Sequence, residues 1–147
     1  MGEQYRKNLD VLIITKSYKD LLVFKSFIEC DSIAPQSETN EFDSEYLKSL
    51  SSKYKYKYVV MDYDPAGIEC AKKIEPFGFK VKWVSTDQVM VNNKLKVRDK
   101  DISDYTKNNG IEAGLDKTKE MFNELPKKYF RDDRITYLLK TKAEFTN

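Results

Sequence analysis

One segment near the middle of the chain constrains the fold most, because it joins the end of a strand to the start of a helix. Residues 59–61 are apolar, Asp62, Tyr63 and Asp64 come next, and Pro65 follows at once. Pro is favoured in the first turn of a helix, and Asp is favoured at the position that caps it. The segment therefore predicts a buried strand that ends in two carboxylates, with a helix directly behind them.

Short apolar runs and helical periodicities alternate over much of the chain. The runs that predict strands are residues 10–15, 32–34, 54–61 and 79–84. The segments that predict helices are residues 18–28, 43–51 and 66–75. This order predicts an α/β fold with a parallel sheet and helices on its faces. Such sheets bind ligands beyond the carboxyl ends of their strands.

Beyond residue 110, segments 111–125 and 129–139 predict two further helices, so that residues 111–147 form a helical C-terminal extension. The whole chain of 147 residues, with 40% apolar side chains, predicts a single domain whose core spans about residues 10–110.

Composition excludes several classes of function. The chain has no histidine, and Cys30 and Cys70 lie far apart, which excludes zinc fingers and Ser-His triads. The net charge is only +2, so any nucleic-acid contact must come from a local basic patch. No signal sequence or long apolar segment is visible, and we expect a cytoplasmic protein without membrane contact.

Five acidic residues fall where parallel strands are expected to end. They are Asp20, Asp62, Asp64, Asp101 and Asp104. If Asp62 and Asp64 continue the strand, their side chains point to the same side. Paired carboxylates suit Mg²⁺, which often takes its remaining ligands from water and substrate phosphates. Helix capping by Asp64 and Asp101 is the competing interpretation of these residues.

Three segments in order resemble the motifs of the TOPRIM domain, in the version found in the DNA primases of bacteria and phages. They are Thr-Lys-Ser-Tyr-Lys-Asp at residues 15–20, Met-Asp-Tyr-Asp-Pro-Ala-Gly at 61–67 and Lys-Asp-Ile-Ser-Asp at 100–104. The resemblance covers about residues 10–110. It implies a Rossmann-like, four-stranded parallel sheet flanked by helices, with Mg²⁺ or Mn²⁺ at the Asp-x-Asp. In the family such a site supports primer synthesis, strand cleavage and rejoining, or hydrolysis.

The resemblance also implies roles for particular residues. The catalytic group is Lys16, Asp20, Asp62 and Asp64, the metal ligands are Asp62, Asp64 and Asp101, and the cofactor or phosphate contacts are Lys100, Asp101 and Asp104.

Lys16 stands where the family has a glutamate. A lysine cannot bind Mg²⁺ as a carboxylate does, and three explanations compete. Lys16 can hold a phosphate as a point charge, another acid such as Glu38 can replace the glutamate, or catalysis can be lost.

The favoured function is Mg²⁺-dependent nucleotidyl transfer by a phage-like primase, as a fragment or as one part of a replication complex. Its partners would be a single-stranded DNA template, nucleotides, and a helicase or other primase subunits, in a bacterial cell or a phage-infected host. The alternatives are a catalytically reduced module that binds nucleic acid or a replication protein, a TOPRIM nuclease, and a receiver-like domain. Basic residues 72 and 73, and 94, 96, 98 and 100, are better placed to meet phosphates than the lysines of residues 53–57.

Overall fold

The computed structural model describes residues 9–35 and 43–131. The main elements, in chain order, are β1 (Val11–Thr15), α1 (Tyr18–Phe27), β2 (Asp31–Ile33), α2 (Ser44–Lys53), β3 (Tyr56–Val60), α3 (Pro65–Ile74), β4 (Lys80–Lys82), β5 (Gln88–Val91), β6 (Lys94–Val97), α4 (Ile102–Asn109) and α5 (Ile111–Met121). Two short 3-10 turns, η2 (Glu75–Phe77) and η3 (Lys127–Tyr129), complete the described part of the chain.

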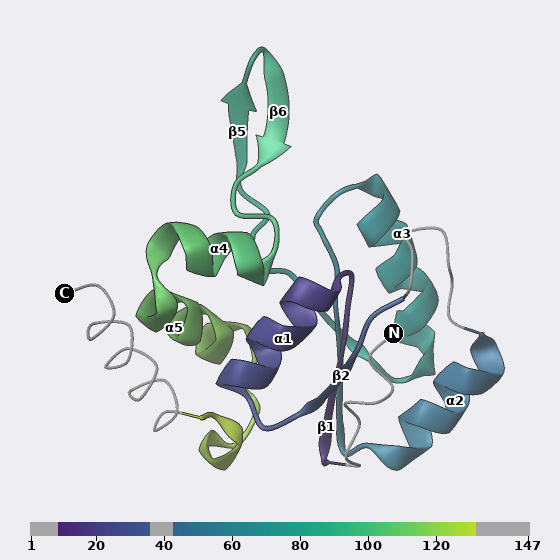
Figure 1. Cartoon of the computed structure of the whole chain (residues 1–147). Coiled ribbons are helices and arrows are strands. Elements are labelled where there is room, and N and C mark those ends of the chain that lie inside the picture. Colours follow the sequence, from purple (N-terminus) through teal and green to yellow (C-terminus); the bar gives the residue numbers. More distant parts are fainter. Residues whose placement is uncertain (1–8, 36–42, 132–147) are drawn as a thin grey trace.

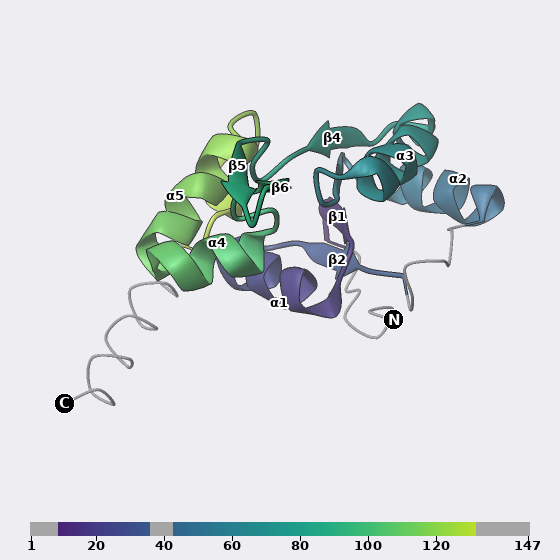
Figure 2. The same cartoon turned by 90° about the horizontal axis from the view of Figure 1, so that it is seen from above.

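Strands β1 to β4 form one parallel sheet in the order β2-β1-β3-β4. Seen along the sheet, α1, α4 and α5 lie on one side and α2 and α3 on the other (Figure 2). All five residues of the central strand β1 are buried because both of its faces are covered. The prediction of an α/β fold with a four-stranded parallel sheet flanked by helices is therefore confirmed.

The alternation of side chains along β1 divides the interior into two cores. Val11 and Ile13 belong to the core under α1, α4 and α5, whereas Leu12 and Ile14 belong to the core under α2 and α3. Phe122 lies in the centre of the first core, where its ring meets the ring of Tyr58 edge to face with 4.7 Å between centroids. The two cores fix the helices on both sides of the sheet, and with them the loops at its carboxyl edge.

The C-terminal part departs from the sequence prediction. Helix α5 ends at Met121 rather than residue 125, although Leu125 is buried as a core residue should be. A helix starting at residue 129 is wrong, because η3 ends at Tyr129 and Phe130 is extended and bridges Ile28. Backbone bonds from Glu29 N–H to the Tyr129 carbonyl (2.7 Å) and from Arg131 N–H to the Phe27 carbonyl (2.9 Å) hold this geometry. The rest of the predicted helix, residues 132–139, lies outside the described residues.

Strands β5 and β6 form a hairpin that was not expected from the sequence, which we call the β5–β6 hairpin (residues 88–97). Its strands pair antiparallel, and the two turn residues Asn92 and Asn93 have φ of 52° and 63°. Positive φ at both central positions is typical of a type I′ turn, whose twist matches that of the flanking strands. The hairpin stands away from the four-stranded sheet (Figure 1). Among the described residues no helix has the length and apolar character needed to span a membrane.

Candidate metal and phosphate site

Asp62 lies just beyond the carboxyl end of β3. The strand ends at Val60, and a bond from Asp64 N–H to the Asp62 carbonyl (2.9 Å) turns the chain immediately. The Asp62 residue is only 2% exposed. This turn places Asp62 and Asp64 at the same edge of the sheet. The strand does not continue to them, so the alternation of strand side chains does not apply to this pair.

Asp64 starts α3 as the sequence predicts. Its Oδ1 accepts a bond from Gly67 N–H at 2.7 Å, and Pro65 occupies the first turn. Gly67 is required for a different reason, since a Cβ at that position would overlap the backbone carbonyl of Asp62. The absence of a side chain at Gly67 therefore lets the first turn of α3 press against the segment that carries Asp62.

Asp20 reaches the same edge from the first turn of α1. The residue is only 4% exposed, and its Oδ1 accepts two bonds from Ser103, one from N–H (3.1 Å) and one from Oγ (2.7 Å). Ser103 lies in the first turn of α4, whose cap is Asp101; Asp101 Oδ1 accepts from Asp104 N–H at 2.7 Å. The contact between Asp20 and Ser103 thus ties α1 to the start of α4.

These local structures bring three acids together. Carboxylate oxygens of Asp20, Asp62 and Asp101, one from each, all lie within 4.8 Å of one another. In an octahedral Mg²⁺ site with metal–oxygen distances of about 2.1 Å, adjacent oxygens are about 3 Å apart and opposite ones about 4.2 Å, so the three carboxylates would move closer together to bind the ion. This acidic cluster, which we call the Asp20–Asp62–Asp101 cluster, can hold a metal ion. Asp64, which the resemblance implies as a ligand, is the helix cap beside it.

Two lysines already face the cluster. Lys16 Nζ lies 2.8 Å from Asp62 Oδ2, and Lys100 Nζ lies 3.8 Å from the same oxygen. The Lys16 side chain is 31% exposed and that of Asp62 is 3% exposed, so the ion pair has one buried and one accessible member. With Asp64 and Asp104 at the same edge, its five carboxylates and two ammonium groups sum to a charge of −3, and a divalent cation would change the sum to −1 and so weaken the repulsion of phosphate.

Burial perturbs two of the acids. It raises the pKa of Asp20 from its usual 3.8 to about 6; the neighbouring Asp101 charge adds to the rise, and the bonds from Ser103 oppose it. Burial also raises the pKa of Asp101, and the charges of Asp104 and Asp62 act in the same direction. A cation in the cluster would favour the ionised form of both groups.

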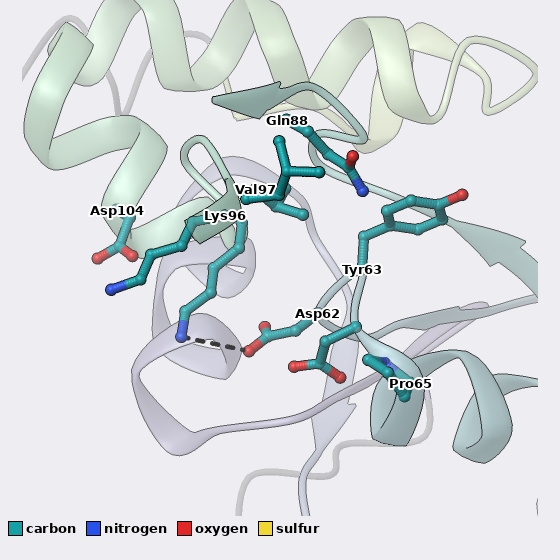
Figure 3. A pocket seen from close by; sticks show the side chains of 10 residues that line it. Asp62, Tyr63, Pro65, Gln88, Lys96, Val97 and Asp104 are labelled. Carbon is teal, nitrogen blue, oxygen red and sulfur yellow. Dashed lines mark ion pairs between the residues drawn. The ribbon is translucent and has the colours of Figure 1, made fainter. Parts of the chain in front are cut away.

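A pocket of about 490 Å³ opens beside the cluster (Figure 3). Asp62, Tyr63 and Pro65 form one wall, Gln88, Lys96 and Val97 of the hairpin lie across from them, and Asp104 lies at the side of α4. Asp64, Leu95 and Lys100 also contribute to its lining. The volume is in the range of small-molecule sites, and both signs of charge are present.

All seven predicted site residues therefore lie at one edge of the sheet. Asp20, Asp62 and Asp101 form the cluster, Lys16 and Lys100 face Asp62, and Asp64 and Asp104 line the adjoining pocket. Glu38, the alternative acid, lies outside the described residues.

Two contributors to this edge were not expected from the sequence. Ser103 is part of the third motif, but its bonds to Asp20 depend on packing across more than eighty residues. The hairpin did leave a signal, because a pair of asparagines separates the apolar run at residues 89–91 from Leu95 and Val97, which alternate with lysines.

Comparisons with known proteins do not assign the chain to a family. No family model matches the sequence, no curated protein matches it, and no solved structure matches the fold. The resemblance to TOPRIM domains therefore rests on the three motifs.

Proposed function

We propose that this chain is a TOPRIM-like domain for metal-dependent nucleotidyl transfer of the DNA primase type. One observation carries the proposal, namely the Asp20–Asp62–Asp101 cluster beyond the carboxyl ends of β1 and β3, with a pocket beside it that Lys96 and Lys100 help to line. Mg²⁺ and Mn²⁺ prefer such oxygen ligands, and sites that bind them commonly leave positions for substrate phosphates.

The bound metal would supply charge neutralisation for the phosphates undergoing transfer. Asp62 is the natural central ligand, because it is buried and flanked by the two other acids. Lys16 and Lys100 now neutralise Asp62, and on metal binding they would be released to hold phosphate oxygens. The first turn of α3, tightly packed on Asp62, presents backbone N–H groups at the same edge.

The resemblance of the three motifs to the version found in DNA primases supports the primase type. The substrates would be a single-stranded DNA template and nucleotides. A helicase or other primase subunits would complete the reaction.

Calorimetric titration with Mn²⁺ and with Mg²⁺ tests the site directly. The wild type is expected to bind, and Asp62→Asn is expected to lose binding while keeping its shape and size. Asp116→Asn is the matched control, because Asp116 is exposed on α5 away from the cluster, and its binding should equal that of wild type. Absence of metal binding to the wild type, both alone and with nucleotide added, would refute the proposal. Primer synthesis with the partners supplied is the next measurement.

One observation favours a second function, a catalytically reduced TOPRIM-like module that binds nucleic acid or a replication protein. It is the 2.8 Å ion pair of Lys16 with Asp62, in which the ammonium group lies beside the carboxylate that would bind the metal. Lys16→Met separates the two functions. If Lys16 serves phosphate binding, the variant loses nucleotide affinity; if Lys16 replaces the metal, the variant gains metal affinity and nucleotide affinity is unchanged. Cleavage of nucleic acid by the metal-loaded wild type, without primer synthesis, would instead identify a nuclease.

A further inference from the structure

The β5–β6 hairpin has one mostly apolar face, and one face on which lysines lie opposite valines, which we call the basic face. The cross-strand pairs Met90–Leu95 and Gln88–Val97 place their side chains on one face, and the pairs Val89–Lys96 and Val91–Lys94 place theirs on the other. The ladder continues one step further, since Arg98 N–H donates to the Asp87 carbonyl at 2.9 Å. Arg98 therefore follows Lys94 and Lys96 on the basic face.

Neither face is covered within the described residues. Met90 is 63% exposed and Leu95 is 64% exposed, which is unusual for large apolar side chains directly opposite each other. The two strands pair only with each other among the described elements, and Figure 1 shows them projecting beyond α4. A two-stranded hairpin is marginally stable alone, so a ligand that contacts these side chains would stabilise it.

Charge identifies the chemistry of the ligand. Residues 87–98 contain three basic side chains and one acidic one, Asp87 opposite Arg98, in a protein whose net charge is only +2. The three basic residues occupy alternate positions, which separates them by about 7 Å along the strand. An array of this kind complements a polyanion with regularly spaced charges.

The hairpin leads into the candidate site. Gln88, Leu95 and Val97 of its apolar face line the 490 Å³ pocket together with Asp62. Lys96 lines the pocket as well, which shows that a long basic side chain reaches round the edge of the ribbon. The next basic residue along the chain, Lys100, approaches Asp62 Oδ2 to 3.8 Å.

We propose that the β5–β6 hairpin binds a single strand of nucleic acid and guides it to the Asp20–Asp62–Asp101 cluster. Met90 and Leu95 contact unstacked bases, and Lys94, Lys96 and Arg98 contact phosphates from the edge of the ribbon. A single strand fits better than a duplex because only unpaired bases expose their faces to apolar side chains. The inference deepens the proposed function, since it rests on phosphoryl chemistry at the cluster.

The test measures binding of fluorescein-labelled oligo(dT) and oligo(rU) by anisotropy in EDTA, without metal. The hairpin variant is Lys94→Gln, Lys96→Gln and Arg98→Gln together. The matched control is Lys48→Gln, Lys53→Gln and Lys127→Gln, three exposed lysines on α2 and η3, far from the hairpin. Loss of three phosphate contacts should lower the slope of log K against log salt by about 2 and weaken binding about 100-fold at 0.1 M salt. The control should bind as wild type does.

A second variant, Met90→Ser with Leu95→Ser, tests the apolar face. We expect a several-fold loss of affinity with an unchanged salt slope. Far-UV circular dichroism and thermal melting verify that each variant is folded. Comparison of the two oligonucleotides shows whether the strand is DNA or RNA, and binding of either one supports the inference.

Several results would overturn the inference. One is an equal loss of oligonucleotide affinity in the hairpin and control variants, and another is tighter binding of a duplex than of either single strand. A third is self-association in sedimentation velocity that only the Met90 and Leu95 changes abolish. The last result would identify the hairpin as a contact between copies of the chain. Nucleic-acid binding is measured in EDTA and therefore does not depend on metal. If the hairpin variant loses nucleic-acid affinity but the wild type binds no metal, the strand-binding role stands and only the proposed chemistry is refuted. If the wild type binds metal but the hairpin variant keeps its nucleic-acid affinity, the strand-binding role is refuted and the proposed chemistry stands.

Discussion

Replacing Asp20 by Asn should stabilise the metal-free protein at neutral pH. Burial raises the pKa of Asp20 to about 6 in the folded state, against 3.8 for the ordinary carboxyl group. The folded protein therefore holds the Asp20 proton more tightly than the unfolded chain does. The stability that this proton provides is complete below pH 3.8 and is lost as the pH rises to 6 and above.

The pKa difference sets the magnitude of the effect. A shift of about two units, at about 1.4 kcal/mol per unit, gives up to about 3 kcal/mol above pH 6, and about 1 kcal/mol at pH 4.5. Asn keeps a carbonyl oxygen where Asp20 Oδ1 accepts both bonds from Ser103, so those contacts survive the change. Asp20→Asn should therefore leave stability at pH 3.5 nearly unchanged and increase it by about 1–3 kcal/mol at pH 7.5.

Urea unfolding in EDTA, followed by circular dichroism between pH 3.5 and 7.5, measures this difference. The control is Asp116→Asn on the exposed side of α5, which should change stability by less than about 0.5 kcal/mol. Saturating Mg²⁺ should reverse the order of wild type and Asp20→Asn, because only the wild type keeps all three carboxylates for the ion. A stability difference that does not vary with pH, or a destabilised Asp20→Asn at pH 7.5, would refute the reasoning.

Two further substitutions test the packing that supports the site. Gly67→Ala should destabilise the protein by about 1–3 kcal/mol and weaken metal binding in calorimetry, because the new Cβ overlaps the Asp62 carbonyl and must push α3 away; unaltered metal affinity would show that the close approach does not position Asp62. Phe122→Ala should cost about 3–5 kcal/mol in urea unfolding, because the ring is fully buried against Tyr58 and Phe24; a loss below about 1 kcal/mol would mean that the core under α5 closes over the gap.

Much of the sheet could be predicted from the sequence because its signals are local. The apolar run at β1 and the Asp64-Pro65 helix start each reflect the conformational preference of a few neighbouring residues. Gly78, with φ of 96°, ends η2 just before the last strand of the sheet. Where the local signal was weak or tertiary pairing overrode it, the prediction failed, as at Phe130, whose extended backbone pairs with Ile28.

The sequence by itself determined the order of strands and helices from β1 to β4, and therefore that the acids following β1 and β3 share one edge of the sheet. Only the tertiary structure decided how they meet. It placed Asp20 in the cluster through Ser103, left Asp64 as the cap of α3, and brought Lys16 to Asp62. The physical reason is that alternation, capping and turn preferences act over a few residues, whereas distances between side chains forty to eighty residues apart depend on how the helices pack on the sheet.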